Sequence, residues 1–179
     1  MELVVANTEE KLEKIKELYL KSFPEEELKP FSLLIEKSRE GLGEMLCIEE
    51  DGEFKGHALM ALYKDLALLD YFAICEDKRG CGIGGKVLAL LQERYADKRF
   101  LLEAETLSVP CDNMKQRQRR MNFYHRCGMV EDGMLVEVRG VAMDVLVPKE
   151  KVSFEEYCDL YRNVFGEEIY RQVKLLKKY

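Results

Sequence analysis

Residues 79–84 read Arg-Gly-Cys-Gly-Ile-Gly, and another glycine follows at position 85. This stretch lies between an apolar run at residues 68–74 and an apolar-faced segment that continues to about Tyr95. The order predicts a strand, a glycine-rich turn and a helix. The first N–H groups of a helix have no acceptor within it, so they favour an anionic ligand. We therefore expect a phosphate-binding site; the alternative is a tight turn that merely requires glycine.

The spacing of the glycines separates the known kinds of phosphate loop. Lys86 follows Gly85 as in a P-loop, but Val87 stands where that loop needs a Ser or Thr hydroxyl for magnesium. A dinucleotide fingerprint stays open as a weaker alternative, because glycines recur at alternate positions. The acidic residue that would bind the ribose in that case is expected about 20 residues on, where Glu103 and Glu105 lie.

The composition is that of a soluble globular protein. The chain has 179 residues and a net charge of -6, which argues against a general nucleic-acid binder and favours a cationic or neutral substrate. No apolar run approaches the ~20 residues of a membrane span, and residues 1–7 do not resemble a signal peptide. The six cysteines are scattered and the two histidines are far apart, so we expect reduced thiols, no metal and a cytoplasmic location.

Apolar periodicity and turn residues predict a mixed α+β fold. Strands are expected at residues 2–6, 45–49, 54–63, 67–74, 100–104, 130–138 and 141–147, and helices at residues 8–23, 31–40, 84–95 and 113–127. Asp51-Gly52 predicts an antiparallel hairpin. The strand–helix–strand order around the glycine loop predicts one parallel pair in an otherwise mostly antiparallel sheet. Ligands favour the carboxyl ends of such parallel strands, where the loop falls.

The last 32 residues form an appendage in this interpretation. Residues 148–151 read as a polar linker after a domain of residues 1–147, and residues 148–179 are expected to be a helical extension. Ser153 and Glu156 form a capping box that starts one helix, Gly166 interrupts it, and a last helix is expected to reach the terminus. The sequence leaves three roles open for this tail: it could pack on the core, cover the site or join a homodimer.

Two separated motifs resemble the GNAT N-acetyltransferase superfamily. Residues 72–84, Phe-Ala-Ile-Cys-Glu-Asp-Lys-Arg-Gly-Cys-Gly-Ile-Gly, are similar to its strand, pyrophosphate loop and helix. Residues 122–129, Asn-Phe-Tyr-His-Arg-Cys-Gly-Met, are similar to its Phe-Tyr-x-x-x-Gly-Phe signature, with Met129 in place of the usual aromatic residue. The resemblance covers residues 1 to about 147 and does not explain the tail.

The resemblance implies a site for acetyl-coenzyme A. Backbone amides of the loop would hold the pyrophosphate, the pantetheine arm would pair with the strand edge, and an N–H near Ile74 would stabilise the oxyanion. Asn113 resembles the family's pantetheine-contacting residue. The cofactor-binding residues expected in this way are Phe72, Ala73, Ile74, Arg79, Gly80, Cys81, Gly82, Ile83, Gly84, Gly85 and Asn113.

The resemblance also implies catalytic roles. Tyr124 occupies the position of a general acid in many family members; a core tyrosine is the alternative. Glu103 and Glu105 share one face of a strand, so either is a candidate base, and a solvated sheet face is the alternative. Asp70 is out of register with the family's strand glutamate, so this route looks closed. We expect His57 on a strand and His125 on a helix surface, without catalytic roles.

The function expected is N-acetyl transfer from acetyl-coenzyme A to a primary amine of a small molecule or peptide. A non-catalytic module that senses coenzyme A through the same fold is the main alternative, and a nucleotide-binding protein is a weaker one. Five basic residues crowd one predicted helix; they could bind an anionic group or form a solvated face paired with carboxylates. They are Lys115, Arg117, Arg119, Arg120 and Arg126.

Overall fold

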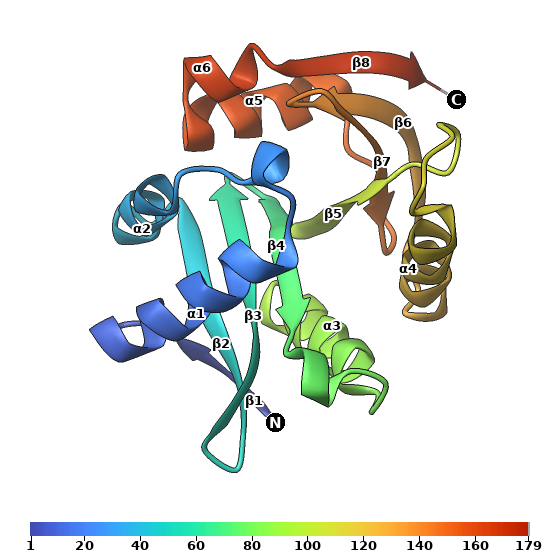
Figure 1. Cartoon of the computed structure of the whole chain (residues 1–179). Coiled ribbons are helices and arrows are strands. Elements are labelled where there is room, and N and C mark those ends of the chain that lie inside the picture. The colour runs from blue at the N-terminus through green and yellow to red at the C-terminus, as the bar shows by residue number, and fades with distance from the viewer. Residues whose placement is uncertain (179) are drawn as a thin grey trace.

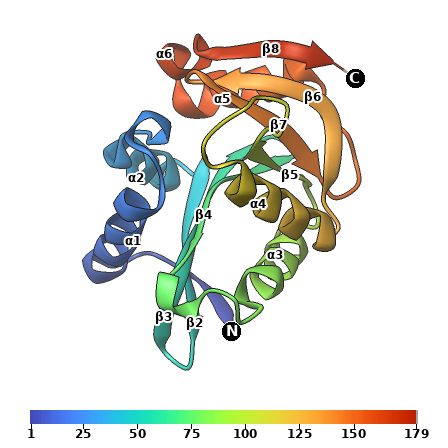
Figure 2. The same cartoon turned by 45° about the vertical axis from the view of Figure 1, so that its right-hand side comes forward.

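A twisted eight-stranded sheet with helices on both faces organises the protein (Figures 1 and 2). The structure, a computed structural model, describes residues 1–178. The elements are β1 (Glu2–Val5), α1 (Glu9–Ser22), the 3-10 helix η1 (Glu25–Glu27), α2 (Phe31–Arg39), β2 (Gly43–Glu50), β3 (Glu53–Tyr63), β4 (Leu66–Ile74), the 3-10 helix η2 (Glu76–Lys78), α3 (Ile83–Arg94), β5 (Arg99–Glu105), α4 (Met114–Arg126), β6 (Val130–Val138), β7 (Val141–Val147), α5 (Phe154–Phe165), α6 (Glu167–Tyr170) and β8 (Val173–Lys178). The mixed α+β fold expected from the sequence is confirmed.

The strands pair in the order β1-β2-β3-β4-β5-β7-β6-β8. Within the described residues every neighbouring pair is antiparallel except β4 and β5, which are parallel as predicted. Asp51 and Gly52 join β2 to β3, and both have positive φ, 53° and 75°. Tight hairpins of this twist need that backbone conformation. The Asp-Gly signal therefore identified this turn correctly.

The parallel pair is short, and this opens the sheet at its centre. β4 and β5 pair only from Leu66 opposite Arg99 to Leu69 opposite Leu102. Beyond Leu102, β5 pairs only with β7 on its other side, while β4 stays paired with β3 as far as Ile74. The carboxyl-terminal halves of the two strands thus separate, and their inner edges keep unpaired backbone groups available for a ligand.

The sheet buries two hydrophobic clusters, one on each face. Helices α1, α2 and α5 pack on the first face, where Tyr19, Leu68 and Tyr161 are buried together. Helices α3 and α4 pack on the second face around Leu88, Leu102 and other residues. Figure 2 shows α1 and α2 on one side of β4 and α3 and α4 on the other. The glycine loop and the helix of the second motif consequently share one face of the sheet.

A β-bulge interrupts the alternation of β4 at Asp70. Leu59 of β3 lies opposite Tyr71, but the next residue, Met60, lies opposite Leu69, so Asp70 is the additional residue. A bulge turns side chains that follow it to the other face. Tyr71 therefore belongs to the first cluster together with Leu68, although an unbroken strand would place these residues on opposite faces.

The C-terminal segment differs from the expectation. The capping box of Ser153 and Glu156 is present and starts α5. However, the prediction of a last helix reaching the terminus is wrong, because α6 is only four residues long and β8 follows it. β8 pairs antiparallel with β6, from Val138 opposite Val173 onward. The edge of β6 offers unpaired backbone groups to which β8 can bond. The sequence of the last residues alone does not show that this edge lies beside them, so it could not predict a strand here. The domain boundary at residue 147 stays a prediction.

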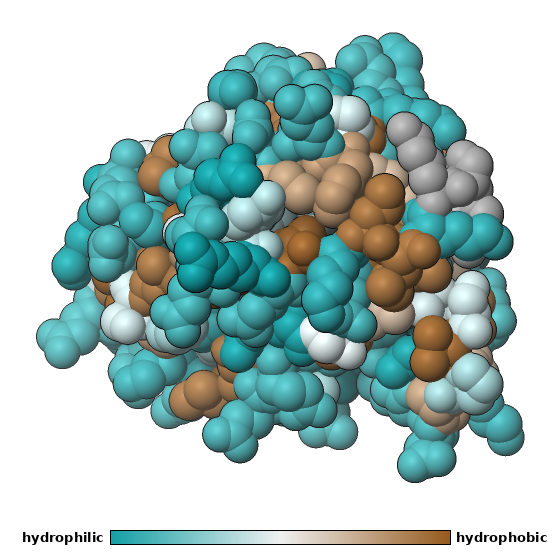
Figure 3. Space-filling model, turned by 90° about the horizontal axis from the view of Figure 1, so that it is seen from above, coloured by the Kyte–Doolittle hydropathy of each residue, from teal (hydrophilic) through white to brown (hydrophobic). Residues whose placement is uncertain are grey.

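The face formed by this segment is mainly hydrophilic, with apolar residues near the C-terminus (Figure 3). Leu175 and Leu176 of β8 are 40% and 47% exposed. The homodimer and the cytoplasmic location expected from the sequence stay predictions. Within residues 1–178, no helix combines the length and apolar composition needed to cross a bilayer.

Candidate active site

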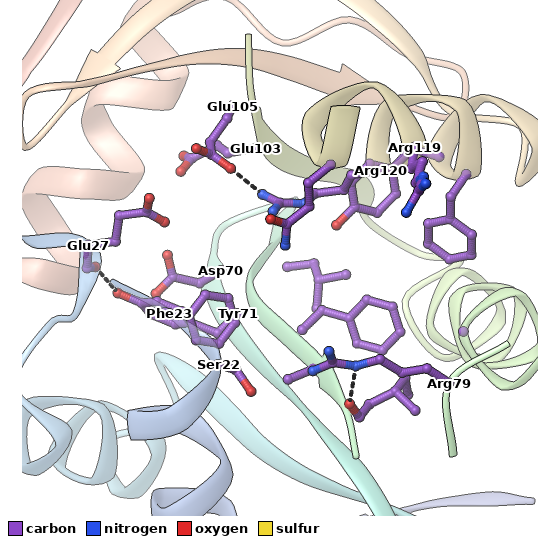
Figure 4. A pocket seen from close by; sticks show the side chains of 18 of the residues that line it. Ser22, Phe23, Glu27, Asp70, Tyr71, Arg79, Glu103, Glu105, Arg119 and Arg120 are labelled. Carbon is purple, nitrogen blue, oxygen red and sulfur yellow. Dashed lines mark hydrogen bonds and ion pairs between the residues drawn. The ribbon is translucent and has the colours of Figure 1, made fainter. Parts of the chain in front are cut away.

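A cavity of about 1260 Å³ occupies the opening between β4 and β5. It extends from the glycine loop to the side chains of β5 and of the segment after α1 (Figure 4). Cys81 is the one sequence-predicted site residue outside the lining; its side chain is exposed. The predicted residues that line the cavity are Phe72, Ala73, Ile74, Arg79, Gly80, Gly82, Ile83, Gly84, Gly85, Glu103, Glu105, Asn113 and Tyr124. Tertiary structure thus brings the two sequence motifs to one cavity.

The glycine loop presents backbone amides to this cavity. Gly82 precedes α3 with φ 77°, a left-handed conformation that favours glycine. The N–H of Lys86 is the first to bond back, to the Gly82 carbonyl at 3.3 Å, which leaves the N–H groups of residues 83–85 without an intrahelical acceptor. A β-carbon on Gly84 would lie 3.0 Å from the Phe123 ring, so glycine also lets α4 pack closely here. The loop therefore offers unpaired N–H donors at the start of a helix, as an anionic ligand requires.

Near the loop, one edge of β4 is paired with β3 and the other edge faces the opening toward β5. The N–H of Cys75 donates to the Lys55 carbonyl on β3 at 2.9 Å. Since backbone groups of successive strand residues point to opposite edges, those of Ile74 face the separated side. The Arg79 side chain folds back over this edge, and its Nε donates to the Ile74 carbonyl at 3.0 Å (Figure 4). An extended ligand could replace that contact and pair with the strand.

Tyr124 projects from α4 into the cavity wall and is 8% exposed. Burial raises the pKa of its phenol, so the hydroxyl stays protonated at neutral pH. Asn113 precedes α4 and accepts a hydrogen bond from Arg117 Nε at 2.9 Å. Its side chain is thereby engaged within the protein, although it lines the cavity.

The arginines of α4 divide into two groups. Arg117 and Arg120 bind the two carboxylate oxygens of Glu105 at 2.8 and 2.5 Å, and Glu105 is 7% exposed. Arg117 and Arg120 therefore pair with a carboxylate, which was one of the two roles expected for the basic residues of this helix. Arg119 and Arg126 also line the cavity, and no ion pair is found for either within the described residues. They leave positive charge available for an anionic ligand.

Glu103 has different partners from Glu105. Its Oε1 accepts hydrogen bonds from the hydroxyl groups of Tyr157 at 2.5 Å and Tyr161 at 2.7 Å, both on α5. Burial raises the pKa of the Glu103 carboxyl, and the positive charge of Lys29 opposes that shift. The C-terminal segment therefore supports a site residue, a contact that no motif in the sequence indicated.

Asp70 lines the cavity, although the sequence analysis gave it no catalytic role. Because the bulge lets the strand accommodate an extra residue, Asp70 reaches the Lys29 ammonium at 2.6 Å, and both side chains are 4% exposed. The ammonium also lies 4.4 Å from the centre of the Phe165 ring. Burial raises the pKa of Asp70, and Lys29 opposes this. The one sign in the sequence that Asp70 has a special role was its charge within an otherwise apolar strand.

The two histidines lie where the sequence placed them. His57 is fully buried on β3, and burial lowers its pKa to about 3, so the ring is neutral at pH 7. His125 is exposed on α4 and lies 3.0 Å from Glu131. Sequence reasoning missed several other residues that line the cavity, from the end of α1 and the segment after it, from β4 and from the β6–β7 turn. They are Ser22, Phe23, Glu27, Lys29, Tyr71 and Arg139.

Comparison with known proteins agrees with this arrangement. The model of the acetyltransferase (GNAT) family matches residues 12–129. This chain belongs to that family. YjbC of Bacillus subtilis (strain 168), named as a candidate acetyltransferase, is 35% identical over 75 residues. That match spans only 41% of this chain and 36% of YjbC.

Solved structures with low sequence identity share the fold. A candidate acetyltransferase of the GNAT family from Bacteroides thetaiotaomicron has a TM-score of 0.75 and 22% identity, over 93% of this chain and 98% of that one. An aminoglycoside 6'-N-acetyltransferase complexed with coenzyme A has a TM-score of 0.66 and 14% identity, over 86% and 100%. A spermidine N-acetyltransferase chimera from Vibrio cholerae and hSSAT has a TM-score of 0.62 and 15% identity, over 82% and 95%.

Proposed function

We propose that this protein transfers the acetyl group of acetyl-coenzyme A to a primary amine of a small molecule or peptide. The observation that carries the proposal is the single cavity that joins the loop amides to Tyr124 and Glu103. Family membership supports acyl transfer in general. A neighbour in fold was solved with coenzyme A, which supports this donor.

The donor half of the cavity suits an acyl-coenzyme A. The amides of residues 83–85 and the positive end of α3 favour the pyrophosphate. Arg119 and Arg126 add charge for phosphate groups. The free edge at Phe72 and Ile74 offers hydrogen bonds to the amides of an extended pantetheine arm. A backbone N–H at this edge would stabilise the oxyanion of the reacting carbonyl.

The acceptor half supplies proton transfer. The amine must lose a proton, its nitrogen forms a bond to the acetyl carbon, and the carbon–sulfur bond breaks with protonation of the departing thiolate. We assign Tyr124 as the acid for the thiolate, because its hydroxyl is protonated at neutral pH. We assign Glu103 as the base, acting on the amine directly or through a water.

Glu103 suits the role of base better than Glu105 for two reasons. Both oxygens of Glu105 are bound by arginines, so neither oxygen is left to contact the amine of an acceptor. Only Oε1 of Glu103 has hydrogen-bond partners in the described residues, so Oε2 remains for the acceptor. In addition, burial moves the pKa of Glu103 upward, toward the range in which a base works at neutral pH.

Ligand-dependent melting and thiol release together test the proposal. Coenzyme A at 100 times its dissociation constant should stabilise the fold by about 2.7 kcal/mol, more than ATP or NAD at equal concentration. Acetyl-coenzyme A with an amine should release thiol at a rate that depends on the amine. Stabilisation by coenzyme A without release for any amine would support the sensing module instead. Greater stabilisation by ATP or NAD would contradict the donor assignment.

A further inference from the structure

Three carboxylates converge at the end of the cavity away from the glycine loop (Figure 4). Glu27 comes from η1, Asp70 from the bulge of β4, and Glu103 from β5. Asp70 is the most informative of them, because its side chain is 4% exposed and its Oδ2 has no hydrogen-bond partner among the described residues. A buried acceptor atom without a partner is costly in a folded protein, so a ligand that donates to it is expected.

The other two carboxylates also keep unused acceptor capacity. Within residues 1–178, no hydrogen bond or ion pair involves the Glu27 carboxylate, and none involves Oε2 of Glu103. Burial raises the pKa of Glu27, and Glu105 adds to that shift. A positive ligand would relieve the unfavourable desolvation of these groups.

The protein's own cations do not use these free acceptor atoms. Among the described residues Lys29 is the one ammonium in contact with the three carboxylates, and it binds Oδ1 of Asp70 rather than Oδ2. Arg139 donates to the Leu28 carbonyl. The arginines Arg117 and Arg120 are engaged by Glu105. These cations balance much of the negative charge, but within the described residues none of them hydrogen-bonds to Asp70 Oδ2, the Glu27 carboxylate or Glu103 Oε2. Those acceptor atoms remain for a ligand where the acceptor must enter.

We propose that this acidic end binds a second ammonium group of the acceptor, through Asp70 Oδ2 and the Glu27 carboxylate, while Glu103 faces the amine that reacts. The acceptor is then a dicationic amine rather than a monoamine or an amino acid. A carboxylate on the acceptor would be repelled by the same groups. This proposal rests on the proposed function, since it names the acceptor of the same reaction.

Three acceptors of equal chain length test it. The protein is assayed at pH 8 with acetyl-coenzyme A and 1,4-diaminobutane, 1-aminobutane or 4-aminobutanoate, whose far ends are positive, neutral and negative. We expect kcat/KM for the diamine to exceed that for 1-aminobutane at least tenfold, with 4-aminobutanoate the poorest. A diamine no better than 1-aminobutane, or a preference for 4-aminobutanoate, would overturn the proposal.

Isosteric variants locate the effect. Glu27→Gln and Asp70→Asn should each lower the ratio of kcat/KM for diamine over 1-aminobutane at least fivefold. Glu26→Gln is the matched control, because Glu26 is exposed on the same turn and does not line the cavity. Damage to folding would lower both rates alike and leave the ratio unchanged. An unchanged ratio in both active-site variants would refute the assignment.

A binding measurement separates this proposal from the proposed function. Titration calorimetry of 1,4-diaminobutane into the protein saturated with coenzyme A should detect binding that Glu27→Gln weakens. If no amine gives thiol release but this binding is present, the catalytic function fails while the ammonium site stands. No binding of the diamine at millimolar concentration, whatever the result of the activity assay, would overturn the ammonium site.

Discussion

At the scale of the residue, the glycines of the loop combine two physical requirements. Gly82 must adopt a positive φ, and Gly84 must leave room for the Phe123 ring. The sequence revealed only that glycine is frequent here, because a one-dimensional pattern does not separate backbone conformation from close packing. The two requirements can be separated by substitution.

Gly82→Ala is expected to destabilise the protein by about 1 kcal/mol, because alanine disfavours the left-handed conformation. It should also weaken coenzyme A binding, since the loop amides would turn away. Gly41→Ala is the control: Gly41 has φ 75°, and a β-carbon would meet no atom within 4 Å at either position. Urea melts should give similar losses for both variants, whereas only Gly82→Ala should raise the dissociation constant. Equal dissociation constants would contradict the role of this loop.

Tyr124→Phe tests the assigned acid. Removing the hydroxyl should lower kcat by about 100-fold when acyl transfer limits the rate, because general acid catalysis contributes at least this much. The melting temperature should change little, since no hydrogen bond of the hydroxyl is found in the described residues. Tyr63→Phe, at the end of β3 and outside the cavity, serves as the control. A Tyr124→Phe enzyme with wild-type turnover would eliminate this assignment.

At the scale of the element, α5 links the C-terminal segment to the site. The hydroxyl groups of Tyr157 and Tyr161 on this helix donate to Glu103, which lies 54 and 58 residues earlier in the sequence. Periodicity correctly predicted the helix and its cap, because both signals are local. Its partner could not be predicted, because pairing over such separations depends on how α5 packs on the sheet.

Tyr161→Phe should shift the acid limb of the pH profile of kcat/KM to higher pH. Burial already raises the pKa of Glu103, and the hydrogen bond from Tyr161 lowers it; losing that bond raises it further. One bond to a charged group is worth about 1.5 kcal/mol, so the shift should approach about one pH unit. Tyr170→Phe, on α6, is the control with no such bond to Glu103. A shift to lower pH, or none, would argue against Glu103 as the base.

At the scale of the whole molecule, residues 148–178 are integrated with the rest. Helix α5 contributes Tyr157, Leu160 and Phe165 to the first hydrophobic cluster, and β8 covers the edge of β6. Burying large apolar side chains is the main source of folding free energy. The polar linker at residues 148–151 left open whether the following segment packs on the core, because linker composition carries no information about what packs after it.

Truncation tests this integration. A chain of residues 1–147 should fail to unfold cooperatively and should aggregate, because it exposes the apolar face that α5 covers. A chain of residues 1–172 lacks β8 but keeps α5, so it should fold with a lower melting temperature. Circular dichroism and size-exclusion chromatography distinguish the two. A cooperative, monomeric 1–147 fragment would show that the boundary at residue 147 marks an independent domain.

The sequence by itself determined the strand, glycine loop and helix and the hairpin at Asp51-Gly52, since these follow from neighbouring residues. It also predicted the parallel pair, because a strand–helix–strand order implies a crossover connection. Those local signals also located the end of the cavity that we propose for the donor. Only the tertiary structure decided that Asp70 reaches Lys29, 41 residues away, that Tyr157 and Tyr161 bind Glu103, and that the last residues form a strand. The reason is physical: a bulge, a buried ion pair and an edge strand are stabilised by partners distant in sequence, so no local pattern specifies them.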